Sequence, residues 1–171
     1  RSFARGGRFA GDLDGDGAHD LIVAATSEDT RAGRIHVVLG AEIVAGTNTL
    51  SSLQHVSHGG VSINGYAGQA LASGGDLNND GWDDIIIGGP GSSNGNSEAG
   101  EAWVVLSGES GDRALINASS SFYGEAGEQV GSSVGMADIN GDGRSDVLIG
   151  VPGESSLLTG EGAVYIGISG H

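Results

Sequence analysis

Three short segments of this sequence crowd oxygen-bearing side chains at one fixed spacing. In each segment, positions 1, 3, 5 and 9 carry Asp or Asn, and position 6 is glycine. Carboxylates a few ångströms apart repel one another, so such crowding calls for a compensating positive charge. Hard oxygen ligands with no His or Cys among them favour Ca²⁺ over zinc or copper. The three segments are 12–20, 76–84 and 138–146.

The spacing predicts three structural calcium sites. In a tightly curled loop, alternate side chains turn inward, glycine at position 6 permits the sharp turn, and the backbone carbonyl at position 7 adds a ligand. The first predicted ligand set is Asp12, Asp14, Asp16, Ala18 and Asp20, with the turn at Gly17. The second is Asp76, Asn78, Asp80, Trp82 and Asp84, with Gly81. The third is Asp138, Asn140, Asp142, Arg144 and Asp146, with Gly143.

Other calcium loops fit the spacing less well. An EF-hand needs an acidic ligand at position 12, where these loops carry Val23, Ile87 and Ile149. Dockerin-like and thrombospondin-like loops fail for want of a late acid or of cysteines. A single segment of this kind could be an Asx-rich surface turn, but three copies in register argue against that interpretation.

Short β-strands are the elements that must position these loops. Each loop runs directly into a continuous apolar, β-branched segment, which is typical of a strand covered on both faces. These segments are 20–25, 83–89 and 146–151, and further strands are expected in 34–39, 101–106 and 160–166. Inner strands are expected within 69–75 and 131–137, and outer strands near 61–64 and 119–123.

The strands belong to a repeated unit. The acidic segments recur at offsets of 64 and 62 residues, so each unit holds about 63 residues and four antiparallel strands. Four-stranded sheets repeated along a chain predict an all-β protein built of β-propeller blades. We expect a single segment, 1–171, with units of approximately 1–65, 66–123 and 124–171, the last lacking its outer strand.

Three blades are too few to close a propeller, which typically has four to eight. We therefore expect either a part of a larger propeller or an association of copies of this chain. The first residue is Arg1 rather than Met, which indicates a mature or excised piece.

The composition excludes several classes of function. The 171 residues carry a formal charge of −15, from 22 acidic and seven basic side chains, which argues against binding to nucleic acid or to an anionic membrane. No apolar run approaches the ~20 residues of a membrane-spanning helix, so no membrane insertion is expected. The chain has no cysteine, which excludes disulfides and thiol chemistry.

The units resemble FG-GAP repeats, the blades of the integrin α-subunit propeller. The segments "DLNNDGWDDIIIGGPG" and "DINGDGRSDVLIGVPG" carry the resemblance, with Gly88-Gly89-Pro90 and Gly150-Val151-Pro152 at the family's Gly-Ala-Pro element. The first unit departs from it at Ala24-Ala25-Thr26. The resemblance implies that the acidic loop joins the first two strands of each blade and binds calcium there.

We therefore expect a calcium-stabilised, non-catalytic binding or adhesion scaffold, extracellular or at the cell surface, that presents loops to a protein or glycan ligand. Further propeller blades are the other expected partners, either from a longer chain or from copies of this one. Two alternatives stay open: a self-assembling structural component of an extracellular array, and an accessory domain of a secreted enzyme. A G-x-S-x-G nucleophile motif is absent from the sequence.

A few other residues could do chemistry. His55 and His58 could form a zinc pair, but two exposed loop histidines is the simpler interpretation. His19 is expected to face solvent, and His36 to lie on a blade surface. Trp103 is expected to pack within a strand, whereas Trp82, in an exposed loop, is the better candidate for contact with a partner.

Overall fold

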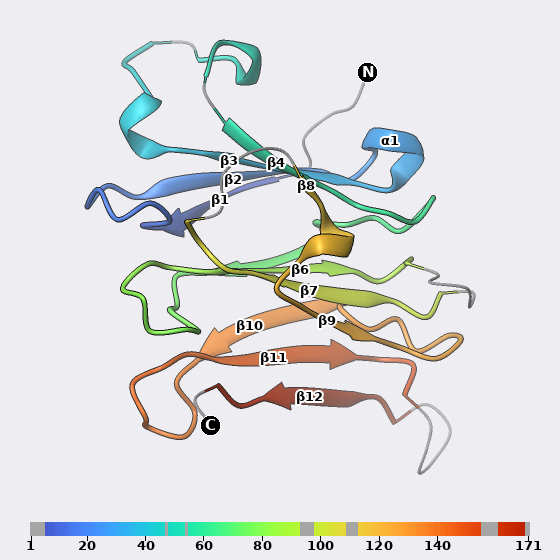
Figure 1. Ribbon diagram of the computed structural model, residues 1–171. Helices are drawn as coiled ribbons and strands as arrows, with labels where there is room; N and C mark the ends of the chain where they lie inside the picture. The colour runs from blue at the N-terminus through green and yellow to red at the C-terminus, as the bar shows by residue number, and fades with distance from the viewer. Residues whose placement is uncertain are drawn as a thin grey trace.

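Three antiparallel β-sheets follow one another along the chain and stack face to face as an open array (Figure 1). The computed structural model describes residues 6–46, 48–53, 55–92, 98–108, 113–154 and 161–169. Within these residues the chain is nearly all β, with only short helical turns: α1 (Glu28–Arg31), η1 (Gly40–Glu42), η2 (Leu50–Ser52) and η3 (Leu115–Asn117). The expected all-β class and the blade architecture of a partial propeller are confirmed.

Each sheet is one blade. The first contains β1 (Gly6–Gly11), β2 (Asp20–Ala25), β3 (Arg34–Val38) and β4 (His55–Gly59), in that order. The second contains β5 (Ala70–Ser73), β6 (Ile85–Gly89), β7 (Glu101–Val105) and β9 (Ser120–Tyr123). The third contains β10 (Ser133–Ala137), β11 (Asp146–Val151) and β12 (Ala163–Gly167).

The second strand of each blade is apolar because both of its faces are covered. All five residues of β6 are buried. Ile85 and Ile87 enter the core between the first and second blades, whereas Ile86 enters the core between the second and third. Trp103 of β7 is 1% exposed in the first of these cores, which confirms the prediction that it packs inside.

The third blade leaves one face open. Along β12, Ala163 and Tyr165 pack into the core shared with the second blade. The alternating residues Val164 and Ile166 point the other way and remain 59% and 54% exposed. An apolar sheet face of this kind is what a further blade would cover.

The outer strand of the first blade differs from the prediction. It is β4, His55–Gly59, which pairs with β3 in the register Val37↔Val56, whereas Val61 and Ile63 lie beyond it and are exposed. The prediction failed because Val61 and Ile63 show the apolar alternation of a strand although the preceding segment supplies the pairing. The outer strand expected near 119–123 is present as β9.

A two-residue strand, β8 (Arg113–Ala114), was not predicted. It leaves the second blade between β7 and β9 and pairs in parallel with β4, in the register His58↔Arg113 and Gly59↔Ala114. The first sheet therefore has five strands, the last of which comes from the next repeat (Figure 1).

The helices of the described residues are single turns, and none has the length and apolar character needed to cross a bilayer.

Candidate metal centres

Each acidic segment forms the loop between the first two strands of its blade. The first loop (12–20) joins β1 to β2, the second (76–84) joins β5 to β6, and the third (138–146) joins β10 to β11. Because the blades stack in order and their strands run in the same sense, all three loops lie at one end of the array.

The aspartate at position 1 curls each loop around its own carboxylate. In the first loop, Asp12 Oδ1 accepts hydrogen bonds from the amides of Gly15 and Asp16 at 2.7 and 3.1 Å, and Oδ2 accepts one from Gly17 at 2.9 Å. Asp76 and Asp138 repeat this pattern with their own positions 4, 5 and 6. The position-6 glycines take left-handed φ values of 85°, 92° and 90°, where a side chain would strain the backbone.

The aspartate at position 9 fastens each loop to its sheet. Asp20 is fully buried; its Oδ2 accepts the amide of Leu13 and its Oδ1 the amide of Gly40, each at 2.7 Å. Gly40 follows β3, so this one carboxylate links the loop to the end of the third strand. Asp84 and Asp146 make the same two bonds, to Leu77 and Ser107 and to Ile139 and Ser169.

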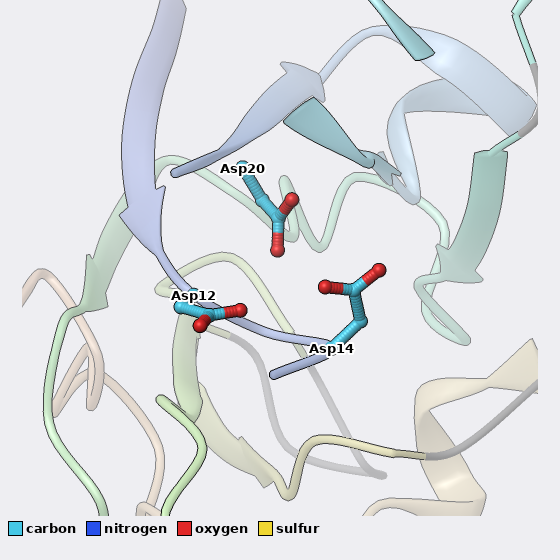
Figure 2. A group of neighbouring side chains, drawn as sticks. All are labelled: Asp12, Asp14 and Asp20. Atoms are coloured by element: carbon cyan, nitrogen blue, oxygen red, sulfur yellow. The ribbon is translucent and has the colours of Figure 1, made fainter. Parts of the chain in front are cut away.

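The first loop brings three carboxylates together. Ligand oxygens of Asp12, Asp14 and Asp20 all lie within 4.8 Å of one another, and their carboxyl groups converge on a common space (Figure 2). Asp16 stands outside this group, and its Oδ1 accepts the amide of Ala18 at 2.7 Å. Among the described residues, this is the only set of three acidic or histidine side chains with such spacing.

The second and third loops differ at position 3. Asn78 and Asn140 occupy it, and each donates its amide NH₂ to the position-5 aspartate, Asp80 or Asp142, at 2.9 Å. The position-5 carboxylates also accept the amides of Trp82 and Arg144 at 2.9 Å. At positions 1, 3, 5 and 9, each of these two loops offers three carboxylates and one amide oxygen to a cation.

The pKa values reflect the crowding. Burial raises the pKa of Asp20 and Asp84, and the charges of neighbouring loop carboxylates raise it further, against the lowering effect of the backbone amides. For Asp12, burial acts to raise the pKa, but amides of the loop, Gly17 first among them, outweigh it and the pKa is lowered. The hydrogen bond from the Ser169 amide is the main cause of the lowered pKa of Asp146.

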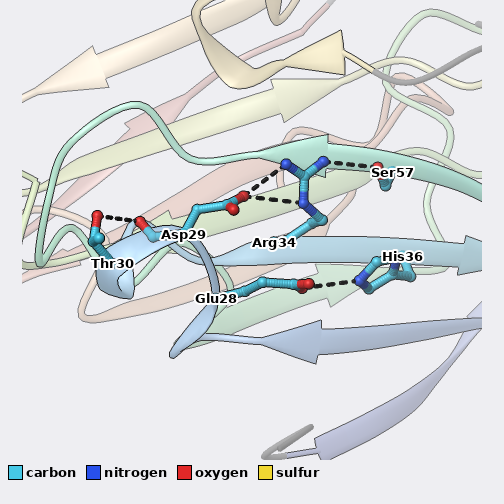
Figure 3. A network of polar contacts seen from close by, with 6 residues as sticks. All are labelled: Glu28, Asp29, Thr30, Arg34, His36 and Ser57. Carbon is cyan, nitrogen blue, oxygen red and sulfur yellow. Dashed lines mark hydrogen bonds and ion pairs between the residues drawn. The ribbon is translucent and has the colours of Figure 1, made fainter. Parts of the chain in front are cut away.

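Several other candidates have different surroundings from those predicted. His58 is 4% exposed within β4, so the interpretation of an exposed loop histidine is wrong for it; the side chain of His55 lies outside the described residues. His36 is also buried, with its Nε2 3.3 Å from Glu28 Oε2, rather than on a blade surface (Figure 3). His19 is exposed, as expected.

The polar pairs at the opposite end of the blades were missed from the sequence. There the turn after the second strand sends a side chain toward the third strand: Glu28 to His36, Ser92 to Glu101, and Glu154 to the Tyr165 hydroxyl at 3.1 Å. Glu28, Ser92 and Glu154 are spaced at the repeat offsets, and that is the signal that could have found them. Beside this pair in the first blade, Arg34 forms a separate set of polar contacts, in which it donates to Asp29 and to Ser57 (Figure 3).

A hollow of about 480 Å³ also opens at this opposite end, where the connection from β4 to β5, the turn from β6 to β7 and the connection from β9 to β10 meet. Its lining combines apolar and uncharged polar side chains with one acid: Ile63, Asn64, Tyr66, Gln69, Pro90, Gly91, Glu98, Gln129 and Ser132. It is therefore separate from the acidic loops and suited to a neutral or basic group.

The repeated loops and blades agree with comparisons to known proteins. The profile of the FG-GAP repeat matches residues 9–38, 67–105 and 130–166, more than half of the chain. The chain belongs to the FG-GAP repeat family. Each matched segment contains one acidic loop and reaches into the third strand of its blade, so each match falls within one blade, and the outer strands β4 and β9 lie outside the matched residues.

The relatives of this FG-GAP chain include integrin alpha subunits. It is 35% identical to integrin alpha-3 of Cricetulus griseus over 108 residues, which is 63% of this chain and 10% of that protein. It is 28% identical to integrin alpha-5 of Xenopus laevis over 92% of this chain and 15% of that protein. A phosphatidylinositol-glycan-specific phospholipase D of Bos taurus is 33% identical over 53% of this chain and 12% of its own length. The chain thus spans a small part of the relatives it matches.

Proposed function

We propose that this chain is a calcium-stabilised, non-catalytic scaffold of FG-GAP blades that works outside the cell and presents loops to a protein or glycan ligand. The observation that carries the proposal is the convergence of Asp12, Asp14 and Asp20 within 4.8 Å, in a loop that its own amides already curl. The second and third loops share that curl and that buried ninth aspartate. Their residues at positions 1, 3, 5, 7 and 9 complete the proposed ligand sets.

Calcium fits these loops on chemical grounds. All the side chains at ligand positions offer oxygen, which is the donor that Ca²⁺ takes. Three bound divalent cations would change the formal charge from −15 to −9 and relieve the repulsion among the loop carboxylates, which adds to burial in raising the pKa of Asp20 and Asp84. Extracellular calcium modules bind at roughly 10⁻⁴–10⁻³ M, so each site would add about 0.4–1.4 kcal/mol at millimolar calcium. Calcium sites of this affinity are typical of extracellular modules, which supports the proposed location.

The binding role is supported by the separation of the proposed cation sites and the hollow, which lie at opposite ends of the blades. The acidic loops occupy one end, where a cation would fix them, and the 480 Å³ hollow opens at the other. The turns around that hollow lie outside the paired strands, so other residues could stand there without breaking the strand pairing. Such loops on a rigid scaffold are where proteins place binding residues.

Two further functions have some support. The open face of β12, with Val164 and Ile166 exposed, favours self-assembly of copies into a larger array. The similarity to part of a phosphatidylinositol-glycan-specific phospholipase D favours an accessory domain beside a catalytic one. Gel filtration with light scattering in millimolar calcium separates the first from a single-chain scaffold, because self-assembly gives a discrete mass above 16.9 kDa that grows with concentration.

Thermal unfolding tests the calcium sites. We expect the melting temperature of the chain to rise with calcium at millimolar concentration, to rise less with magnesium, and to return to its starting value with chelator. Asp14→Ala should remove part of the calcium-dependent rise. Glu42→Gln, which removes an exposed acid outside the loops, should leave it unchanged. Equal rises with calcium in all three proteins would contradict the proposed sites.

A further inference from the structure

The first and second acidic loops are joined through a residue that is not among the proposed ligands. Asp83, at position 8 of the second loop, donates its amide to the carbonyl of Asp12 at 2.9 Å. Its side-chain Oδ2 accepts the amide of Asp12, also at 2.9 Å. Both backbone polar groups of the first ligand of the first loop therefore bond to a single residue of the next blade.

The indole of Trp82 makes a second contact between the same two loops. It lies so close to Gly15, at position 4 of the first loop, that a Cβ there would clash with its Nε1. It also lies against Gly108, which follows β7, and is 37% exposed. Trp82 therefore packs between the two blades and also keeps the exposure expected from the sequence, and its contact with a partner stays a prediction.

The two contacts come from residues adjacent to proposed ligands of the second site. Asp83 lies between Trp82, whose carbonyl is a proposed ligand, and Asp84, whose buried carboxylate is another. A cation that fixes residues 82 and 84 also fixes residue 83, and residue 83 holds Asp12. Asp83 alone therefore connects the proposed ligands of the second site to Asp12 of the first.

We propose that Asp83 and Trp82 are positioning residues for the first cation site, so that the first and second loops bind cations with positive cooperativity. This inference rests on the proposed calcium sites. A cation bound in the second loop fixes the backbone of Asp12 through Asp83. The first loop then loses less conformational entropy when it binds its own cation. Because coupling between two binding equilibria is reciprocal, the first loop helps the second equally.

The third loop is coupled less strongly. Ser145, the counterpart of Asp83, donates its amide to the carbonyl of Asp76 at 2.9 Å, so the backbone bond is repeated. Its hydroxyl lies against Gly75 and carries no charge. Arg144 stands where the second loop has Trp82. We expect the second and third loops to influence each other less than the first and second do.

Three glycine amides report each site separately. Gly17, Gly81 and Gly143 donate to Oδ2 of the first aspartate of their own loops, so each should shift in a ¹⁵N–¹H spectrum when its loop is filled. Titrating the 171-residue chain with calcium gives one midpoint per glycine. Asp80→Ala, which weakens the second site, should raise the Gly17 midpoint about fivefold or more, within the usual range of coupling. Asp142→Ala, in the third loop, should change it less than twofold.

Asp83→Ser tests the connection itself, because it installs the residue found in the third loop. We expect a Gly17 midpoint raised by a similar factor, and no further rise when Asp80→Ala is added. Ser145→Ala is the matched control and should leave the Gly81 midpoint within twofold. Trp82→Leu, which keeps the backbone carbonyl, should act in the same direction as Asp83→Ser and serves if that variant does not fold.

Two outcomes overturn the inference in distinguishable ways. If the three glycine amides shift but Asp80→Ala leaves the Gly17 midpoint unchanged, the sites are independent and only the coupling is refuted. If no amide shifts with calcium in the unmodified chain, the proposed calcium sites fail and the coupling fails with them.

Discussion

Asp84 and Leu77 are joined by a buried hydrogen bond in which the Leu77 amide donates to Oδ2 of the aspartate at 2.8 Å. The other carboxylate oxygen accepts the amide of Ser107 at 2.8 Å, just beyond the end of the third strand, β7. The ninth position of the loop thus has a structural role that does not depend on a cation. It closes the loop onto the sheet, and a cation would add to that closure.

Removing this carboxylate should destabilise the metal-free chain. Asp84→Ala leaves one buried and one half-buried amide without acceptors, so we expect the free energy of unfolding in chelator to fall by about 2–4 kcal/mol. Asp80→Ala is the control, because Asp80 is exposed, and its loss in chelator should be below about 1 kcal/mol. Urea denaturation measures both. Equal losses for the two variants would show that the buried bonds contribute little.

Two glycines distinguish packed from open blade faces. A Cβ at Gly88 would clash with the carbonyl oxygen of Gly131 in the next blade, so Gly88→Ala should destabilise the chain by about 1–3 kcal/mol. A Cβ at Gly135 would meet only the Leu148 Cβ, at 4.0 Å, so Gly135→Ala should change stability by less than about 1 kcal/mol. Thermal or urea unfolding of the pair checks this. The close approach of the second and third blades would be disproved if Gly88→Ala were as stable as Gly135→Ala.

Glu101 should make stability depend on pH. Burial is the main cause that raises its pKa, and the hydrogen bond from Ser92 offsets this only in part. A raised pKa in the folded state means a contribution to stability that is full below the unfolded pKa and is lost as pH rises through the folded value. We therefore expect Glu101→Gln to gain stability relative to the unmodified chain as pH increases from 4 to 7.

Urea unfolding across that pH range, in chelator, gives the difference between the two proteins. The loop carboxylates titrate in both proteins, so their contributions cancel in the difference. A constant difference between pH 4 and pH 7 would show that Glu101 titrates normally in the folded chain.

The exposed face of the third blade should tolerate charge where the matching face of the second does not. Ile166 of β12 pairs with Leu148 of β11, and its counterpart Val104 of β7 pairs with Ile86 of β6. Val104 is buried, so Val104→Lys should cost about 3 kcal/mol or more, whereas Ile166→Lys should change the stability of the monomer by about 0.5 kcal/mol. Light scattering on the Ile166→Lys protein shows at the same time whether this face drives self-association, because the mass should then fall to that of one chain.

The strands next to the loops could be predicted because their signals are local. The segments 20–25 and 146–151 are the bounds of β2 and β11, and glycine at position 6 has the left-handed backbone that the curl requires. The number of blades could also be predicted, because the acidic segment recurs three times at nearly constant spacing.

The parts that were wrong or missed depend on partners far away in the sequence. The outer strand was placed at 61–64 because Val61 and Ile63 alternate, although pairing with β3 selects residues 55–59. His58 is buried by that pairing, and the residues next to it in the sequence give no sign of its burial. Asp83 was passed over because it lies between ligand positions, and its role becomes visible only when Asp12 of the preceding blade lies beside it.

Because of the short strand β8, the first blade depends on the second repeat, and this dependence limits which repeats can be exchanged by recombination. Since Arg113 and Ala114 of the second repeat pair with His58 and Gly59 of the first, the boundary between repeats in the sequence is not a boundary in the sheet. A genetic exchange that deleted or replaced the second repeat would also remove the outermost strand of the first blade and expose the β4 edge. The first two repeats should therefore be inherited as a pair, and duplication or loss of single blades should be better tolerated after the second blade than before it.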